Sequence, residues 1–351
     1  TASSFRWRRR PVAERGCDVR AWVAWAGAAS VLAMLTRNPL YALLLILVAR
    51  LVDAACGRPE RGIALPWARL ALVVLLLSAI FNGLFVHTGE TVLGRLPESW
   101  PLVGGIITLE ALVYGLTTGL VLLALLAIFV AFNHIVPVSD LVRLAPRAFH
   151  DLGVVVLVAV TYVPETVRHL SQVREAQAIR GHQIRGLRDW QPLLVPLLVG
   201  GMERAMGLAE AMVARGYGAA ASRAQQPGML LGLAVGLSLT LAGWLLALWR
   251  GAAGWLLFAA GALLLAGLLW RQGRAVAHTQ YRPHPWQPAD TAIALASLLA
   301  LALALWQGVS LMGYTPYPLV QLPPLSPIVG GALLLLALPA FLCPQHQGRH
   351  V

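Results

Sequence analysis

Long apolar runs alternate with shorter polar intervals along most of the chain, and these runs predict membrane-spanning helices. An α-helix rises about 1.5 Å per residue, so roughly 20 apolar residues cross the ~30 Å hydrocarbon layer of a bilayer. Charged residues are nearly absent from the runs; Glu110 is expected to reach the membrane interface. Their scarcity argues against a proton-coupled carrier. The pattern predicts an all-α, polytopic helical membrane protein with eight spans, at residues 22–35, 40–52, 70–86, 106–132, 228–249, 255–270, 292–306 and 328–342.

One long polar interval, residues 165–223, divides the chain into regions. Basic loops remain on the cytoplasmic side of a membrane, and the first 20 residues hold an excess of Arg, so we expect the N-terminus in the cytoplasm. The predicted regions are a basic cytoplasmic N-terminus at 1–20, a first set of transmembrane helices at 21–132, an interfacial and cytoplasmic polar region at 133–227, and a second set of transmembrane helices at 228–351.

A short pattern, E-A-x-x-x-R-G, occurs twice in the polar interval. The first repeat, residues 175–181, precedes the second repeat, residues 210–216, by 35 residues. Two isolated arginines could simply be solvated and favoured by the negative C-terminal end of a helix dipole. The repetition of a whole pattern favours a shared function instead. The candidate site residues are Glu175, Ala176, Ala178, Arg180, Gly181, Glu210, Ala211, Ala214, Arg215 and Gly216, with Pro164 ahead of the first repeat.

Each repeat is predicted to end a helix with its Arg-Gly pair. Glycine adopts the left-handed backbone conformation that terminates many helices. Arg180 and Arg215 have no acidic residue three or four positions away, where side chains of one helix meet. Glu175 and Glu210 lie five positions from these arginines and so point in another direction. Each Arg is therefore expected to project from a helix tip.

Both helix tips are expected on the same side of the membrane. The segment between the repeats, 191–201, contains Pro192 and Pro196 and is too short to cross the hydrocarbon layer. The apolar run at 152–163 is also short, so residues 140–164 are expected to lie in the cytoplasmic interface and to lead into the first helix of the pair. The alternative is a true crossing by this run, with the preceding loop or the N-terminus assigned to the wrong side.

The charge balance excludes several classes of function. The net charge is +12, and the sequence contains no Lys, so Arg carries the whole basic excess. A Walker A loop needs Gly-Lys-Ser/Thr around the phosphates, so the chain is not a Walker-type ATPase. The basic excess fits cytoplasmic loops, and no alternation of aromatic and basic residues suggests nucleic-acid binding. We therefore expect a membrane protein with no catalytic residues and no nucleic-acid partner.

The sequence provides little for a metal, cofactor or redox site. Cys17, Cys56 and Cys343 form no C-x-x-C motif, so neither a disulfide framework nor a zinc site is expected. His346 and His350 have the helical spacing of metal ligands, but no acidic residue accompanies them. No cofactor and no metal ligand are therefore predicted.

The two repeats resemble the paired coupling motifs of a known family. Residues 178–181 (Ala-Ile-Arg-Gly) and 214–216 (Ala-Arg-Gly) look like those of the transmembrane T component of energy-coupling factor transporters, importers related to ABC transporters. The resemblance covers about residues 20–250. It departs from the family pattern at Ile179, and the chain continues for about 100 residues beyond the usual core. Further similar segments are Asn38-Pro39-Leu40-Tyr41, Tyr162-Val163-Pro164-Glu165 at the expected start of the first coupling helix, and residues 210–218.

The resemblance implies a subunit that transmits motion and does not catalyse a reaction. In that family, two ABC-type ATPase subunits bind the two cytoplasmic coupling helices. A small membrane-embedded S component binds the vitamin or transition-metal ion to be imported. The resemblance assigns the ATPase contacts to the arginines of the repeats, the helix ends to the glycines, and the mutual orientation of the helices to the glutamates. It places the protein in the cytoplasmic membrane of a bacterium or archaeon.

Two other classes of function fit parts of the pattern. A conventional ABC importer permease also couples through a cytoplasmic helix rich in Glu and Ala, but it normally has one such segment and binds substrate itself. An integral-membrane enzyme that modifies lipids or isoprenoids would turn over its substrate without a bound ATPase. A small membrane subunit that binds together with the ATPases would distinguish the T component from both.

Overall fold

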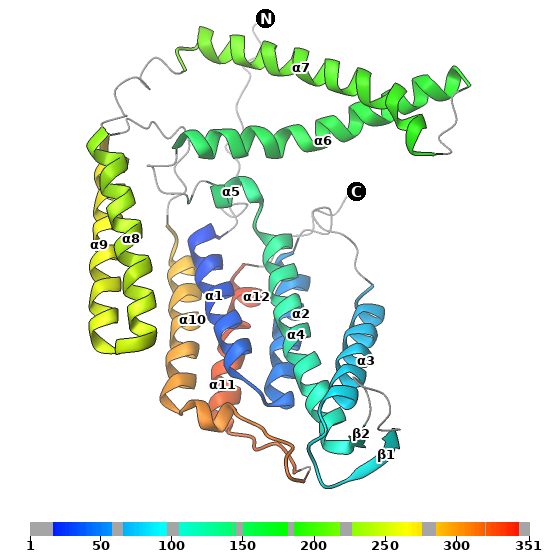
Figure 1. The fold of residues 1–351 in the computed structure, drawn as a ribbon, viewed down its shortest axis with the longest axis vertical. Coiled ribbons are helices and arrows are strands. Elements are labelled where there is room, and N and C mark those ends of the chain that lie inside the picture. Colours follow the sequence, from blue (N-terminus) through cyan, green and yellow to red (C-terminus); the bar gives the residue numbers. More distant parts are fainter. Residues whose placement is uncertain are drawn as a thin grey trace, which may run out of the picture. The chain divides into compact units, whose positions relative to one another are not determined.

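Helices dominate the computed structural model, which describes residues 17–57, 66–96, 105–142, 144, 150–181, 186–217, 227–275, 286–319 and 321–343. The described residues add one two-stranded sheet to these helices (Figure 1), which confirms the predicted all-α fold class. The chain forms two compact units. Unit 1 comprises residues 1–141 and 282–351, and unit 2 comprises residues 142–281.

Eight helices within the described ranges are long and apolar enough to cross a membrane. They are α2 (Pro39–Cys56), α3 (Trp67–Phe85), α4 (Leu109–Ile135), α6 (His150–Ile179), α7 (Gln191–Ala214), α8 (Pro227–Arg250), α9 (Ala252–Ala275) and α10 (Pro288–Trp306). The number equals the predicted number of spans, and a multi-pass membrane protein is confirmed. The eight helices are not the same as the eight predicted spans. α6 and α7 are long and apolar enough to cross a membrane, although no span was predicted there. The predicted spans at 22–35 and 328–342 correspond to shorter helices: α1 (Val19–Leu35), α11 (Pro327–Leu335) and α12 (Leu338–Leu342).

The core of unit 1 lies between α1, α2, α4, α10 and α11. α1 packs against α10 and α4, whereas α2 packs against α4, α11 and α12. α3 packs mainly on α4, so most of its apolar surface remains available to lipid or to a partner. Several large side chains of the core helices are fully buried, among them Trp25, Tyr41, Leu45, Ile128 and Leu333.

The helices that follow residue 286 are part of this core. Trp25 Nε1 donates a hydrogen bond to the carbonyl oxygen of Leu336 (2.8 Å). The Tyr41 hydroxyl accepts one from the backbone N–H of Ser326 (2.6 Å). Since buried polar groups need such partners, these bonds fix α11 and the segments around it against α1 and α2. α10, α11 and α12 therefore complete one bundle with the N-terminal helices.

Polar contacts between distant segments define one end of unit 1, called here the proximal end. The backbone N–H of Asp18 donates to Asp290 Oδ1 (2.7 Å), which joins the starts of α1 and α10. His134 Nδ1 lies 2.7 Å from Asp53 Oδ1, which joins the ends of α2 and α4. Because consecutive helices of the bundle alternate in direction, all four helix ends lie on the same side. The opposite, distal end holds the turn at Asn38, whose side-chain oxygen caps the N-terminus of α2.

The chain leaves unit 1 and returns to it at the proximal end. α4 ends there and α10 begins there, so the residues between them cross the bilayer an even number of times. α8 and α9 pack against each other as a hairpin and therefore cross as a pair. α6 and α7 then either both cross or both remain on one side.

A β-hairpin in the distal part of unit 1 was not predicted. β1 (Val92–Leu96) pairs antiparallel with β2 (Gly105–Thr108). The start of the predicted span at 106–132 is therefore wrong, because its first residues belong to β2 and the helix begins at Leu109. The β-branched residues Ile106 and Ile107 favour a strand, although their apolar character resembles that of the following helix.

Glu110, the acidic residue near the start of α4, is fully buried beside this hairpin. Its carboxylate accepts hydrogen bonds from the Thr91 backbone N–H (3.1 Å) and from the Thr91 hydroxyl. The backbone at Gly89 (φ +135°) passes so close that a Cβ there would lie 2.5 Å from Glu110 Oε2. The side chain therefore anchors the loop before β1.

α6 is one continuous helix of 30 residues, and it corrects the predicted start of the first helix of the pair. Residues 150–164 belong to the same helix as residues 165–179, and Pro164 lies inside that helix instead of at its start. Proline removes one backbone hydrogen bond, but a helix that continues on both sides tolerates this loss. The predicted boundary rested on the change from apolar to polar residues, which alters the surroundings of a helix without ending it.

Glycines bring α8 and α9 into close backbone contact. A Cβ at Gly243 would collide with the backbone nitrogen of Phe258 in α9. Gly232 and Gly236 lie against leucine side chains of α9, whereas Gly228 has nothing within 4 Å of an added Cβ.

Cys17 and Cys343 are joined by a disulfide, although the sequence suggested no such pairing. Their Cα atoms lie 6.6 Å apart despite a sequence separation of 326 residues. The two cysteines meet because α10, α11 and α12 fold back onto α1 and α2. Sequence spacing contains no information about such a return, so the expectation of unpaired cysteines was wrong for this pair.

Candidate functional site

The first repeat ends α6 as predicted. The backbone N–H of Gly181 donates to the carbonyl of Ala178 (2.9 Å), and Gly181 has a φ of +82°. This left-handed conformation is strained for residues with a Cβ, so glycine suits the position. Arg180 is exposed, and Ile179, which interrupts the family motif, is 88% exposed. The helix therefore presents its last residues to a binding partner or to solvent.

The second repeat ends α7 with the same backbone geometry. Gly216 has a φ of +78°, and its N–H donates to the carbonyl of Val213 (2.9 Å). The N–H of Tyr217 donates to the carbonyl of Met212 (3.0 Å), which completes a Schellman motif. Arg215 and the neighbouring Ala214 are exposed. The sequence repeat thus produces two similar exposed helix ends, called here the Arg-Gly tips (Arg180–Gly181 and Arg215–Gly216).

The arginines of the tips have no ion-pair partner among the residues that the structure describes. The C-terminal end of a helix carries partial negative charge from its free carbonyls, which favours a cation there. An exposed guanidinium still retains its five N–H donors for a planar acceptor such as a carboxylate. Each tip is therefore suited to bind an acidic group on another molecule.

Glu175 and Glu210, to which the resemblance assigns the mutual orientation of the two helices, lie apart from each other. Both carboxylates are exposed. Neither makes an ion pair or a side-chain hydrogen bond within the described part of the chain. Each glutamate lies near the end of its own helix, and those ends are far apart in an antiparallel pair. Ala176 and Ala211, the small residues that follow them, are exposed as well.

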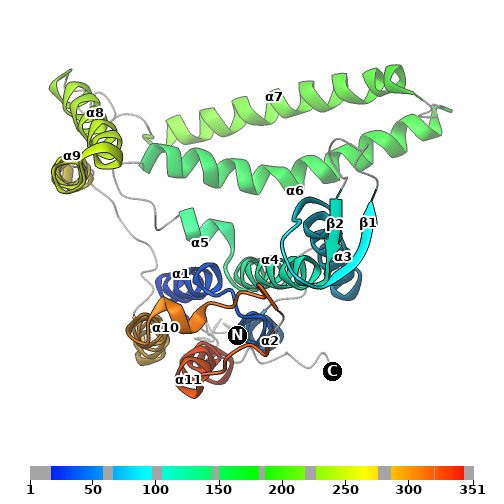
Figure 2. The same cartoon turned by 60° about the horizontal axis from the view of Figure 1, so that its bottom comes forward.

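α6 and α7 pack as an antiparallel pair, joined through the 3-10 helix η4 (Leu187–Trp190). The Tyr162 hydroxyl donates to the carbonyl of Arg204 (3.3 Å), and Gln177 Nε2 donates to that of Pro192 (3.4 Å). Between these contacts, a Cβ at Gly200 would lie 2.9 Å from a ring nitrogen of His169, so glycine permits the helices to approach. Figures 1 and 2 show the two helices running in opposite directions.

The antiparallel arrangement places the Arg-Gly tips at opposite ends of the pair. α7 has 24 residues, so its two ends are about 36 Å apart at ~1.5 Å per residue. Arg180 lies beside the connecting segment that precedes α7, whereas Arg215 follows its last turn. The two tips therefore cannot enter a single groove, and each requires a binding site of its own.

The α6–α7 pair exposes apolar side chains beside its charged ones. Such a mixture is unfavourable in water and indicates contact with a membrane surface or with another protein. Val163 and Met202 are 63% and 66% exposed, although valine and methionine are usually buried. The large exposed apolar residues of the pair include Leu152, Val155, Val163 and Val167 of α6, and Leu194, Leu198, Met202, Met206 and Val213 of α7.

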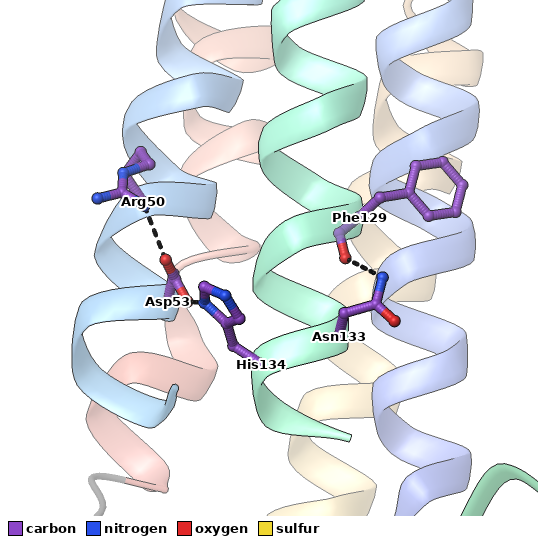
Figure 3. Close-up of polar contacts among 5 residues, drawn as sticks. All are labelled: Arg50, Asp53, Phe129, Asn133 and His134. Carbon is purple, nitrogen blue, oxygen red and sulfur yellow. Dashed lines mark hydrogen bonds and ion pairs between the residues drawn. The ribbon is translucent and has the colours of Figure 1, made fainter. Parts of the chain in front are cut away.

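A polar cluster in unit 1, called here the Asp53 clamp, joins three helices at the proximal end of the unit (Figure 3). Asp53 Oδ2 lies 2.7 Å from Arg50 NH1, and Asp53 Oδ1 lies 2.7 Å from His134 Nδ1. A carboxylate can only accept hydrogen bonds, so His134 donates from Nδ1. The Arg50 guanidinium lies 4.6 Å from the ring centroid of Trp67, at the start of α3. The clamp thus holds α2, α3 and α4 together where α4 ends.

This clamp was not predicted from the sequence. Arg50 and Asp53 are three residues apart on one helix, a spacing that brings opposite charges together and could have indicated a local ion pair. His134 is 81 residues from Asp53, and no local signal connects the two. The clamp lies immediately before the chain passes into unit 2, so it fixes the last residues of the membrane helix from which α6 and α7 follow.

Replacement of Asp53 by Ala is expected to destabilise unit 1. The change leaves a partly buried Arg50 and His134 without their acceptor, which costs about 1–3 kcal/mol. Thermal unfolding of the purified protein would measure the loss. Asn133→Ala is the matched control, because Asn133 Nδ2 donates to the carbonyl of Phe129 in its own helix (2.9 Å, Figure 3) and joins no other element. An equal effect of both substitutions would contradict the assigned role of the clamp.

No group of three or more His, Cys, Asp or Glu side chains in the described ranges is arranged to hold a metal ion. The predicted pair of metal-spaced residues, His346 and His350, lies outside those ranges. Among the residues that the structure describes, the features that suit a function are the two Arg-Gly tips, the exposed α6–α7 surface and the Asp53 clamp.

Comparison with known proteins agrees with the likeness carried by the repeats. A family model described as cobalt transport protein (CbiQ) matches residues 13–227. The chain is also 34% identical over 80 residues to the energy-coupling factor transporter transmembrane protein EcfT of Staphylococcus aureus (strain 04-02981). That alignment covers 21% of this chain and 30% of the relative, so it spans less than a third of the relative's length. The family match contains both tips and ends where α8 begins.

Proposed function

Because the chain belongs to the CbiQ family of cobalt transport proteins, we propose that it is the energy-coupling membrane subunit of an energy-coupling factor importer. In this proposal the α6–α7 pair receives motion from cytoplasmic ATPases and passes it to the membrane helices. The membrane helices in turn hold a small substrate-binding S component. The cargo is a vitamin or a transition-metal ion.

The observation that carries the proposal is the presence of two equivalent Arg-Gly tips at opposite ends of one helical pair. ABC-type ATPases act as pairs of similar subunits, so two sites of the same shape, about 36 Å apart, match one site on each subunit. Closure of the two subunits on ATP would move the tips relative to each other. A rigid helix transmits such a displacement along its whole length. The α6–α7 pair would therefore pass the movement of both ATPase subunits to the membrane helices.

The chemistry of the tips suits an acidic groove on each ATPase. Guanidinium groups bind carboxylates through two parallel hydrogen bonds, which fixes direction as well as distance. Gly181 and Gly216 carry no side chain, so the backbone of the partner can approach the helix end. The absence of Lys rules out a Walker A loop in this chain, so ATP hydrolysis is assigned to the partner subunits.

We further propose that α6 and α7 lie along the cytoplasmic surface instead of crossing the bilayer. The last two turns of α6 carry Arg174 and Glu175, and α7 carries Glu203, Arg204 and Glu210. A charged side chain at the centre of a bilayer costs about 2.5–3.5 kcal/mol on insertion scales. An exposed apolar face combined with such charges suits an interfacial helix. Both tips would then face the cytosol.

Thiol labelling of Arg180→Cys and Arg215→Cys tests this placement. A membrane-impermeant maleimide should label both variants from the cytoplasmic side, above the signal of the unsubstituted chain. Leu322→Cys is the control for the other side, because Leu322 is 94% exposed and lies in the segment beside the distal turn at Asn38. Labelling of residues 180 and 215 from opposite sides would rule out a common motor surface for the two tips.

The composition of the purified complex separates the proposal from a permease that binds its own substrate. Mild solubilisation should recover the chain together with two ATPase subunits and a small membrane protein. Removal of that small protein should abolish substrate binding and leave the ATPases attached. Retention of substrate by this chain with the ATPases alone would favour the permease.

A further inference from the structure

The three cysteines of the chain gather at the proximal end of unit 1. Cys17 precedes α1, Cys56 ends α2, and Cys343 follows α12. Cys17 and Cys343 are joined, and the Cys56 thiol donates to the carbonyl of Pro339 (3.4 Å). The backbone N–H of Cys343 donates to that same carbonyl (2.9 Å). Three segments that are far apart in sequence therefore bring their sulfur atoms into one small region.

The three cysteine residues differ in their exposure to solvent. Cys17 and Cys343 are half-buried, whereas Cys56 is 1% exposed. The 6.6 Å between the Cα atoms of Cys17 and Cys343 lies within the range that disulfides span without backbone movement. A small thiol or disulfide reagent can therefore reach this pair, while Cys56 is protected beside it.

The disulfide between Cys17 and Cys343 holds α12, the last helix of the bundle, in place. α12 has five residues, and a helix of that length has little stability of its own. It packs against the end of α2, close in sequence to the Asp53 clamp. The bond connects it to the start of α1, so the part of the chain beyond the family match is linked covalently to the part within it.

We propose that Cys17 and Cys343 form a reversible thiol–disulfide clasp that fixes α12 to the N-terminal helices. The oxidant is a low-molecular-weight disulfide. The thiolate of one cysteine attacks a sulfur of that disulfide, forms a mixed disulfide and releases one thiolate. The second cysteine then attacks the protein-bound sulfur of the mixed disulfide and releases the other thiolate. Two protein thiols are oxidised, one small disulfide is reduced to two thiols, and the protons remain with the products.

Reversibility follows from the side of the membrane on which the clasp lies. The orientation proposed above places the proximal end in the cytosol, where thiol reductants keep most cysteines reduced. An accessible disulfide there opens and closes with the ratio of oxidised to reduced small thiols. This step rests on the proposed function only through the orientation, whereas the pairing of Cys17 with Cys343 does not depend on it.

The test uses the full-length protein treated with oxidised or reduced glutathione, alkylated and digested for mass spectrometry. Oxidation should yield a peptide pair linked through Cys17 and Cys343, and reduced glutathione should remove it without denaturation. Cys56 should become alkylated only after unfolding. The oxidised protein should melt several degrees above the reduced protein, because a closed loop restricts the unfolded chain. Failure of Arg180→Cys and Arg215→Cys to label from one side would leave these expectations unchanged, so the two proposals fail separately.

Two variants complete the test. Cys343→Ser should lose both the linked peptide and the difference in melting temperature between oxidised and reduced protein. Cys56→Ser should keep both, because a serine hydroxyl can still donate to the carbonyl of Pro339. A bond to Cys56, a bond between two chains, a linked pair that resists glutathione in the folded protein, or equal melting temperatures in both redox states would overturn the clasp.

Discussion

Reversal of charge at the second tip, Arg215→Glu, is expected to reduce ATP-driven uptake by about 10- to 100-fold while the protein still inserts into the membrane. A charge-assisted hydrogen bond contributes about 1.5–3 kcal/mol, which corresponds to roughly that factor in affinity. The substituted carboxylate would also repel an acidic groove, so the loss should exceed that of Arg215→Ala. Uptake of the labelled cargo by cells that contain equal amounts of each protein in the membrane measures the effect.

The same substitution elsewhere on the pair provides the control. Arg174 is exposed on α6, two turns before the first tip, and Arg174→Glu changes the net charge by the same amount. It should reduce uptake far less than Arg180→Glu does. The double variant Arg180→Ala and Arg215→Ala should lose more than either single change, because two attachments support each other through their common scaffold. Unchanged uptake and unchanged ATPase binding in Arg215→Glu would refute the role of the tips.

The helix ends of the candidate site could be predicted from sequence because their causes are local. The left-handed glycine, the hydrogen bond from Gly216 to Val213 and the exposed Arg215 all arise within one turn of chain. The repeat with an offset of 35 residues then indicated that two such ends exist. Their location at opposite ends of an antiparallel pair depends on how α6 packs against α7, which no single repeat determines.

The features that the sequence did not predict are long-range contacts or boundaries. His134 pairs with a carboxylate 81 residues away, and Glu110 accepts hydrogen bonds from a loop that precedes it by 19 residues. The disulfide between Cys17 and Cys343 forms because α10, α11 and α12 pack against α1 and α2. The change in hydropathy at Pro164 predicts a helix boundary, whereas the backbone of α6 continues through this residue.

Close packing of α8 on α9 explains why the second half of the chain can hold a stable hairpin although the described side chains of the two helices make no polar contact with each other. In a bilayer, apolar side chains gain nothing by leaving lipid for protein, so association depends on backbone approach and van der Waals contact. Buried glycines occupy the crossing points, among them Gly243 and Gly261, and a Cβ at the latter would lie 2.6 Å from the backbone nitrogen of Thr240. A backbone atom cannot rotate away as a side chain can. The hairpin is therefore sensitive to a single methyl group.

Gly254→Ala should accordingly separate the two helices and destabilise the protein by about 1–3 kcal/mol, the usual cost of overpacking. An added Cβ at Gly254 would collide with the backbone of Ala247 in α8. Gly267→Ala is the matched control in the same helix, because Gly267 is exposed and has nothing within 4 Å of an added Cβ. There, alanine should stabilise the helix slightly, since it is about 1 kcal/mol more favourable than glycine in a helix interior. Thermal unfolding and the rate of proteolysis near Gly251 compare the two, and equal stability of the variants would mean that α8 and α9 do not approach so closely.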